Sequence, residues 1–130
     1  MRPQRLADSL LLHCYDHAHY ISSEREVIIM ILAIIRMKVL PGKREELLQT
    51  FTSLIVSIRT DKGCKRCDVC QSIEDENEIL LLEEWDSQEN LKIHLKSGRF
   101  RVILGSTNLL QEPYEMMFHK AFHINGVEEP

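Results

Sequence analysis

Three side chains in the second half of the chain could carry chemistry, namely Glu83, Trp85 and His94. The first two end the apolar run ILLLEEW, and the histidine follows nine residues after the tryptophan. An imidazole ordinarily titrates near neutral pH, so a histidine beside a ligand can accept a proton or a hydrogen bond. An indole offers a flat apolar wall and one N–H donor. This trio is suited to holding a small phenolic molecule, with His94 as the candidate base.

The segments around this trio predict how the side chains are positioned. Residues 79–85 favour a buried strand, Ser87 caps the next turn, and a short helix follows to Leu95. The spacing of apolar residues predicts that His94 lies on the inward face of that helix. Trp85 and His94 form a site only if both point into the space between strand and helix. The alternative is that both residues are ordinary core.

Further pocket residues are expected around the trio. Neighbouring strand residues point to opposite faces, so Glu83 and Glu84 cannot form an acid–base couple. We expect Glu83 to be the pocket carboxylate and Glu84 to be solvated or paired with Arg36. Phe100 and Tyr114 are candidate lining residues, and Arg36 is a candidate to orient an oxyanion at the exit of its strand.

Three cysteines have a spacing that occurs in metal sites, but the geometry of a strand argues against a metal site here. Cys64, Cys67 and Cys70 follow the C-x2-C spacing of zinc and iron–sulfur sites. On a strand the outer two would be roughly 20 Å apart, with Cys67 on the other face. Near the start of the chain, His13 and His17 would chelate an ion only if helical, and a polar arm is the simpler interpretation. We expect no metal and no cofactor.

Length and charge narrow the class of protein. The chain has 130 residues, of which 44% are apolar and 28% charged, with a net charge of −4. Scattered basic residues and this net charge argue against nucleic acid as a partner. No stretch approaches the roughly 20 apolar residues of a membrane span, which argues against a membrane partner. Four cysteines without a secretory signal favour reduced thiols in a cytoplasm.

The order of predicted segments indicates an α+β fold. Strand, helix, two hairpin strands, a helix in two pieces and a last strand match the split βαβ, ferredoxin-like arrangement. The expected domain is 27–130, preceded by an N-terminal extension at 1–26. In 27–39 both strand faces are apolar, and one layer of helices can cover only one of them. We therefore expect a four-stranded antiparallel sheet whose bare face pairs in a homodimer.

Three tracts resemble the antibiotic biosynthesis monooxygenase domain, a dimeric α+β barrel group that includes small quinol monooxygenases. They are RMKVLPGKREELL (36–48), KGC (62–64) and LLLEEWDSQENLKIHLKSGRF (80–100). The resemblance covers about residues 28–124 and implies a cofactor-independent monooxygenase acting on a small aromatic phenol or quinol with O2. It also implies that His94 and Trp85 belong to the pocket.

Two departures from the family pattern and one alternative function accompany this resemblance. Cys67 stands where relatives often have an aromatic residue. Relatives often have another aromatic residue near the position of Cys70. Ile35 precedes Arg36, where haem-degrading relatives have an asparagine, so haem binding is disfavoured. The alternative is a non-catalytic ligand-binding or regulatory dimer that uses the same cavity.

Overall fold

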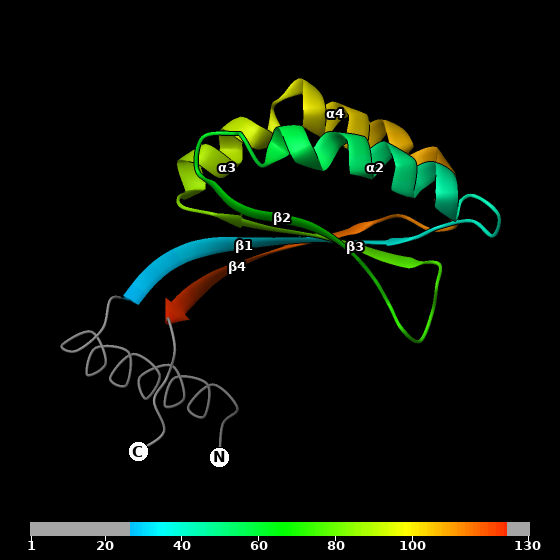
Figure 1. The fold of residues 1–130 in the computed structure, drawn as a ribbon, viewed down its shortest axis with the longest axis horizontal. Helices are drawn as coiled ribbons and strands as arrows, with labels where there is room; N and C mark the ends of the chain where they lie inside the picture. Colours follow the sequence, from blue (N-terminus) through cyan, green and yellow to red (C-terminus); the bar gives the residue numbers. More distant parts are fainter. Residues whose placement is uncertain (1–26, 125–130) are drawn as a thin grey trace, which may run out of the picture. The chain divides into compact units, whose positions relative to one another are not determined.

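The computed structural model describes residues 27–124, and Met30–Ala121 forms a compact unit by itself. Its four strands form one sheet in the order β2-β3-β1-β4. Helices α2, α3 and α4 lie on one side of that sheet (Figure 1). In chain order the elements are β1 (Val27–Lys38), α2 (Arg44–Ile58), β2 (Cys64–Gln71), β3 (Glu78–Trp85), α3 (Gln88–Leu95), α4 (Gly98–Gly105), the 3-10 turn η1 (Ser106–Leu109) and β4 (Glu115–Ile124).

The predicted α+β, ferredoxin-like fold is confirmed. Strand β3 pairs antiparallel with β1 on one side and with β2 on the other. The dimeric barrel stays a prediction, because the structure describes one chain. Residues 1–26, with His13 and His17, lie outside the described residues, so the proposed N-terminal extension is untested.

Strand β3 shows why the core forms on the helical side of the sheet. Its side chains alternate strictly between buried and partly exposed, as the two-residue period of a strand requires. The buried face packs against buried side chains of the helices, which removes apolar surface from water. The core consists mainly of Ala33, Ile35, Met37, Val39, Leu47, Phe51, Ile58, Cys67, Ile79, Leu81, Trp85, Leu91, Phe100, Ile103 and Leu109.

The opposite face of the sheet is also apolar at its centre. Leu32 and Ile34 of β1 and Leu80 and Leu82 of β3 are partly exposed there. The helices do not cover these side chains, since all three lie on the other face (Figure 1). The expectation that a second copy covers this face stays a prediction.

Two short polar signals fix the ends of the helices. The Ser87 hydroxyl accepts a hydrogen bond from the backbone N–H of Asn90 at 3.2 Å, so the predicted N-cap of α3 is confirmed. Ser97 caps α4 in the same way through Phe100 N–H. The predicted helix break therefore lies just before Gly98, which is the first residue of α4.

Gly63 has a different role from the one the sequence suggested. We expected it to end α2, but that helix ends at Ile58, with Arg59 as its C-cap. Gly63 lies in the turn before β2 with φ +85°, and a Cβ there would collide with Asp86 and Asn90. Its carbonyl accepts a hydrogen bond from Asp86 N–H at 2.8 Å. The glycine thus allows this turn to pack tightly against the start of α3.

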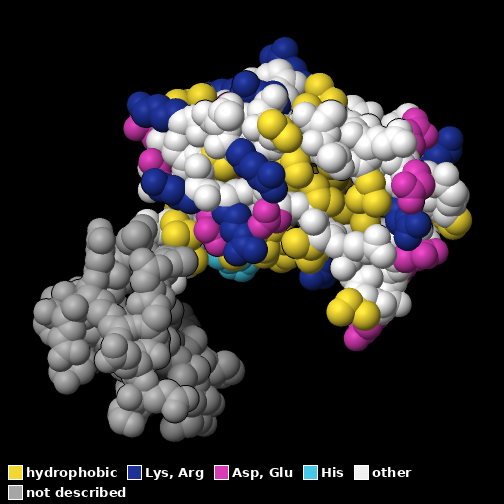
Figure 2. All heavy atoms as spheres, viewed as in Figure 1, with side chains coloured by type: hydrophobic (Ala, Val, Ile, Leu, Met, Phe, Trp, Pro, Cys, Tyr) yellow, Lys and Arg dark blue, Asp and Glu magenta, His cyan; other side chains and the backbone are white. Residues whose placement is uncertain are grey.

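Charges of both signs are interspersed on the face in view in Figure 2, with hydrophobic atoms visible between them. No large patch of one sign gathers there, in agreement with the small net charge of the sequence. Within residues 27–124, no helix is long and apolar enough to cross a membrane.

Candidate functional site

Glu83, Trp85 and His94 form a buried cluster between the sheet and α3. Their exposed fractions are 1%, 0% and 2%. Glu83 and Trp85 share the helical face of β3 because they are two residues apart. His94 lies in the last turn of α3. The sequence predicts a site only if Trp85 and His94 point into the same space between strand and helix. In the structure they do.

The three side chains contact one another directly. Trp85 Nε1 donates a hydrogen bond to Glu83 Oε1 at 3.1 Å. The imidazole of His94 stacks on the indole, with ring centroids 4.7 Å apart and an angle of 29° between the planes. Its Nε2 lies 3.1 Å from Glu83 Oε2. Phe100 meets the same imidazole edge-on, with centroids 5.6 Å apart.

Two further residues extend this cluster toward the surface. Asp61 lies in the loop after α2, and its Oδ2 atom is 3.6 Å from Nδ1 of His94. Arg99, in α4, donates a hydrogen bond from Nη1 to Asp61 Oδ1. The cluster therefore runs in the order Arg99, Asp61, His94, Glu83, Trp85, and its side chains become more buried along that path. We refer to these five residues as the polar cluster.

Sequence reasoning missed Asp61 and Arg99. Asp61 lies just before the KGC tract, and Arg99 immediately precedes Phe100, but nothing in their spacing connects either to His94. The contact depends on how the α2–β2 loop and α4 pack against α3. A charged residue beside a turn is the only signal in the sequence, and most such residues are solvated.

The polar cluster is only partly satisfied in its buried portion. Glu83 Oε2, Asp61 Oδ2 and both ring nitrogens of His94 are buried, and none has an aligned hydrogen bond within the described residues. The close approaches at 3.1 Å and 3.6 Å are therefore electrostatic contacts rather than well-directed hydrogen bonds. Buried polar atoms in this condition are costly and uncommon in folded proteins.

Two thiols next to the cluster stay protonated. Burial raises the pKa of Cys67 to about 12, and the negative charge of Glu83 adds to the shift. Burial, again with the charge of Glu83, raises the pKa of Cys64 to about 11. Neither thiol is a ready nucleophile at neutral pH, since the thiolate is the reactive form. No group of three or more metal-ligating side chains occurs between residues 27 and 124.

A small cleft opens beside the polar cluster. Its volume is about 140 Å³. Trp85 and His94 reach it from inside, whereas Asp61 and Arg99 reach it from the rim, where their side chains are 18% and 41% exposed. The cleft is lined by Asp61, Lys62, Trp85, Asn90, Ile93, His94, Ser97 and Arg99.

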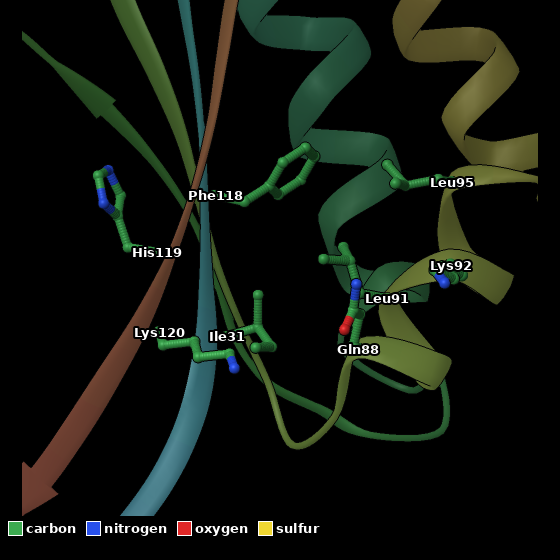
Figure 3. Close-up of a pocket in the computed structure, with 8 residues that line it drawn as sticks. All are labelled: Ile31, Gln88, Leu91, Lys92, Leu95, Phe118, His119 and Lys120. Atoms are coloured by element: carbon green, nitrogen blue, oxygen red, sulfur yellow. The ribbon is translucent and has the colours of Figure 1, made fainter.

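A larger cavity lies on the other side of α3. Its volume is about 330 Å³, and Figure 3 shows it between α3 and the strands β1 and β4. It is lined by Ile31, Gln88, Leu91, Lys92, Leu95, Phe118, His119 and Lys120. None of the six predicted site residues lines it. The repeat of Gln88, Leu91, Lys92 and Leu95 at helical spacing is the signal that could have located it.

Four of the six predicted site residues are brought together, and two are not. Glu83, Trp85 and His94 contact one another, and Phe100 contacts His94. Tyr114 instead lies with Ile35 and other side chains at a small crevice beside α4. Trp85 pairs with Ile31, whereas Tyr114 lies near Ile35 and Met37, farther along β1.

Arg36 is also absent from the polar cluster. It lies on the face of β1 that the helices do not cover, and its Nε is 3.2 Å from Glu78 Oε1. Of the two alternatives for Glu84, solvation or pairing with Arg36, the pairing is not found, and Glu84 Oε1 lies 3.9 Å from Arg66 Nη1. The reason is the alternation of the strand, which places Arg36 and the buried Ile35 on opposite faces.

Comparison with known proteins places this chain in a family. The family model described as "Antibiotic biosynthesis monooxygenase" matches residues 30–104. The curated Bacillus subtilis (strain 168) protein "Putative monooxygenase YcnE" is 29% identical over 89 residues, which cover 68% of this chain and 94% of that protein.

Solved structures agree on the fold. A conserved protein from Methanosarcina mazei Go1 is 26% identical with a TM-score of 0.68, over 71% of this chain and 92% of that one. PA3566 from Pseudomonas aeruginosa is 24% identical with a TM-score of 0.63, over 71% and 93% of the two chains. Since the family model spans more than half of its residues, this chain belongs to the antibiotic biosynthesis monooxygenase family.

Proposed function

We propose that this protein is a cofactor-independent monooxygenase that oxidises a small phenol or quinol with O2 in the cleft beside the polar cluster. The observation that carries the proposal is the imidazole of His94, which is buried between two carboxylates and stacked on Trp85. The cleft volume of about 140 Å³ suits one aromatic ring, since an apolar cavity of roughly 150 Å³ binds benzene in another protein.

The first step is removal of the phenolic proton. Asp61 reaches the cleft from its rim, and its Oδ2 lies 3.6 Å from His94 Nδ1. The proton passes to His94 directly or through Asp61. On the imidazole it lies between the carboxylates of Asp61 and Glu83, whose opposite charge stabilises it. Arg99, at the rim, provides a positive charge for the phenolate.

The second step needs only O2. The phenolate gives one electron to O2, and the two radicals combine to form a carbon–oxygen bond. The O–O bond of the resulting peroxide then breaks with loss of water and leaves a quinone. For 1,4-dihydroxybenzene the products are 2-hydroxy-1,4-benzoquinone and water, so one oxygen atom enters each. The indole of Trp85 and the ring of Phe100 provide apolar walls around the acid–base cluster.

The membership of the chain in its family supports the reaction class, and the name of the Bacillus subtilis relative agrees with it. The substrate is a proposal that rests on the family resemblance and on the size of the cleft. Glu83 contributes by holding both Trp85 and His94, through contacts of 3.1 Å to each. This makes Glu83 a positioning residue, because it does not line the cleft.

Oxygen uptake tests the proposal. Chelator-treated protein is mixed with 1,4-dihydroxybenzene, and O2 consumption is recorded against a protein-free blank. With labelled O2, the quinone should gain one labelled oxygen atom. Loss of an acid–base group should lower the rate by about 100-fold or more, so His94→Gln and Asp61→Asn are expected to approach the blank.

Lys96→Ala provides the matched control, because Lys96 is exposed at the end of α3 and does not line the cleft. Circular dichroism shows whether each variant is folded. An unchanged rate in folded His94→Gln would overturn the assignment of the base. A wild-type rate equal to the blank across single-ring phenols would overturn the reaction itself.

A non-catalytic binding protein is the second candidate function. The observation in its favour is the larger cavity, which has more than twice the volume of the cleft and contains no residue of the polar cluster. A protein of this kind would bind its ligand there without turnover. The oxygen-uptake experiment separates the two functions.

We also propose that two copies pair through the open face of the sheet. Leu32, Ile34, Leu80 and Leu82 form an apolar centre there that the helices leave uncovered. Sedimentation analysis should give a dimer for the wild type and a monomer for Leu82→Glu. A folded wild-type monomer at micromolar concentration would contradict this pairing.

A further inference from the structure

The larger cavity beside α3 has apolar walls contributed by three elements. Ile31 comes from β1, Leu91 and Leu95 from α3, and Phe118 from β4. Figure 3 shows the Phe118 ring extending from its strand toward α3 and the Ile31 side chain pointing into the same space. Phe118 is 47% exposed, so a large aromatic surface faces this cavity without being buried. An apolar ligand that covered it would gain from removal of that surface from water.

Charged groups in the lining of the cavity are of one sign. Lys92 of α3 and Lys120 of β4 both contribute to its wall, and no aspartate or glutamate does. Neither lysine forms an ion pair with another residue of the described range. His119 projects from the opposite side of β4, away from the cavity (Figure 3). The cavity therefore combines an apolar body with a cationic rim.

The size of the cavity fits a small molecule. Its volume of about 330 Å³ is at the lower end of ligand pockets, which span roughly 300–1,000 Å³. The amide of Gln88 adds a hydrogen-bonding group to the same wall. A ligand with a flat or flexible apolar body and one anionic head matches these walls and this rim.

We propose that this cavity is a second binding site, distinct from the cleft at the polar cluster, and that it takes a small amphiphile with a carboxylate head. The apolar body lies against Leu91, Leu95 and Phe118. The carboxylate lies at the rim, where Lys92 and Lys120 neutralise its charge. The proposal does not depend on oxidation in the other cleft, because the two sites share no lining residue.

Calorimetric titration of the full chain tests this proposal with two probes of nearly equal shape. The probes are 2-naphthoate, which carries the carboxylate, and 2-naphthalenemethanol, which is neutral. Exposed ion pairs are weak, so Lys92→Met and Lys120→Met should each weaken naphthoate binding by about two- to five-fold. Both variants should leave the alcohol unaffected, and Lys96→Met should change neither probe.

A second pair of variants separates the apolar contribution from the charge and this site from the cleft. Phe118→Ala should weaken both probes, since it removes part of the wall and lies on an exposed part of β4. His94→Gln should leave naphthoate binding intact while abolishing oxygen uptake.

Three results would overturn the proposal. One is equal affinity for acid and alcohol, or naphthoate binding too weak to measure at millimolar concentration. Another is an equal loss in Lys96→Met and in the two rim variants, which would indicate a general charge effect. The last is loss of naphthoate binding in folded His94→Gln, which would place the ligand in the cleft of the polar cluster instead.

Discussion

The two sides of helix α3 differ in almost every physical property. On one side His94 is 2% exposed and lies between the equally buried Glu83 and the partly exposed Asp61, next to a small cleft. On the other side Leu91 and Leu95 face a larger open cavity whose charged groups are lysines at the rim. The same helix therefore serves two environments: Gln88, Leu91, Lys92 and Leu95 line the cavity, whereas Asn90, Ile93 and His94 line the cleft.

This difference shows where each site derives its sensitivity to substitution. A polar group inside the protein needs a partner, and the partners of His94 come from β3 and from the loop after α2. A lysine at a rim is solvated and needs none. We therefore expect substitutions in the polar cluster to affect folding and chemistry together. Substitutions of the exposed cavity residues Lys92, Phe118 and Lys120 should affect ligand affinity with little change in stability.

The largest effect should come from removing Glu83. Glu83→Ala leaves His94 and the Trp85 N–H without their buried partner, and each buried polar group left unpaired costs about 1–3 kcal/mol, so the combined loss exceeds that of one lost hydrogen bond. The matched cavity variant is Phe118→Ala, which should change the free energy of unfolding by less than about 1 kcal/mol because Phe118 is half exposed. Urea unfolding followed by circular dichroism measures both. Equal losses in the two variants would refute the contrast between the two sides of α3.

A smaller loss is expected for Trp85→Phe. The phenyl ring keeps most of the apolar contact but leaves Glu83 Oε1 without its donor, at a cost of about 1–3 kcal/mol. In a Glu83→Ala background the same substitution should cost clearly less, since the acceptor is already gone. Urea unfolding of the four proteins in this double-mutant cycle gives the coupling. Strictly additive losses would show that the Trp85–Glu83 hydrogen bond does not contribute.

The turn that holds Asp61 near His94 should be sensitive at Gly63. Gly63→Ala forces a side chain into a left-handed backbone position, which costs about 1–2 kcal/mol, and it also meets Asp86 and Asn90. Gly105→Ala is the control, because open space surrounds that helical glycine and alanine there should stabilise by up to about 1 kcal/mol. Thermal unfolding of both variants tests this. A stable Gly63→Ala protein would mean that the turn can rearrange.

The effect that is smallest at neutral pH concerns proton binding by two thiols, and it grows only in alkaline solution. Folding raises the pKa of Cys64 to about 11 and that of Cys67 to about 12, from an ordinary value of 9.0. The folded chain therefore holds these protons after the unfolded chain has lost them. The resulting stability is fully present below pH 9 and is lost as pH rises toward 12.

Unfolding free energies measured from pH 8 to 11 should decline less steeply in a Cys64→Ala/Cys67→Ala protein than in the wild type. The double variant is expected to be less stable at pH 8 because Cys67 is buried, so the slopes are compared rather than the absolute values. Parallel slopes would contradict the raised pKa values of these thiols.

Local patterns predicted much of the fold because their physical causes are local. The apolar run in 79–85, the Ser87 cap and the spacing along α2 each depend on residues within a few positions. The family tracts added the arrangement of strands and helices, and the family model confirms that relationship. Gly63 was misread because positive φ favours glycine both at helix ends and in tight turns.

The candidate site was predictable only where its residues share one segment. The tract 80–100 contains Glu83, Trp85, His94 and Phe100. The strand and helix spacing within it indicated that these side chains face the same interior. Arg36 and Tyr114 were assigned to the site from their side-chain chemistry, without knowledge of how the strands pair. The structure places both away from the polar cluster.

The sequence by itself determined the order of the elements, the inward faces of β3 and α3, and the family. Only the tertiary structure decided that Asp61 and Arg99 join His94, and that α3 separates a polar cluster from an apolar cavity. The physical reason is that periodicity is a property of neighbours along the chain. Partners of a buried charge are chosen by packing between elements that are distant in sequence.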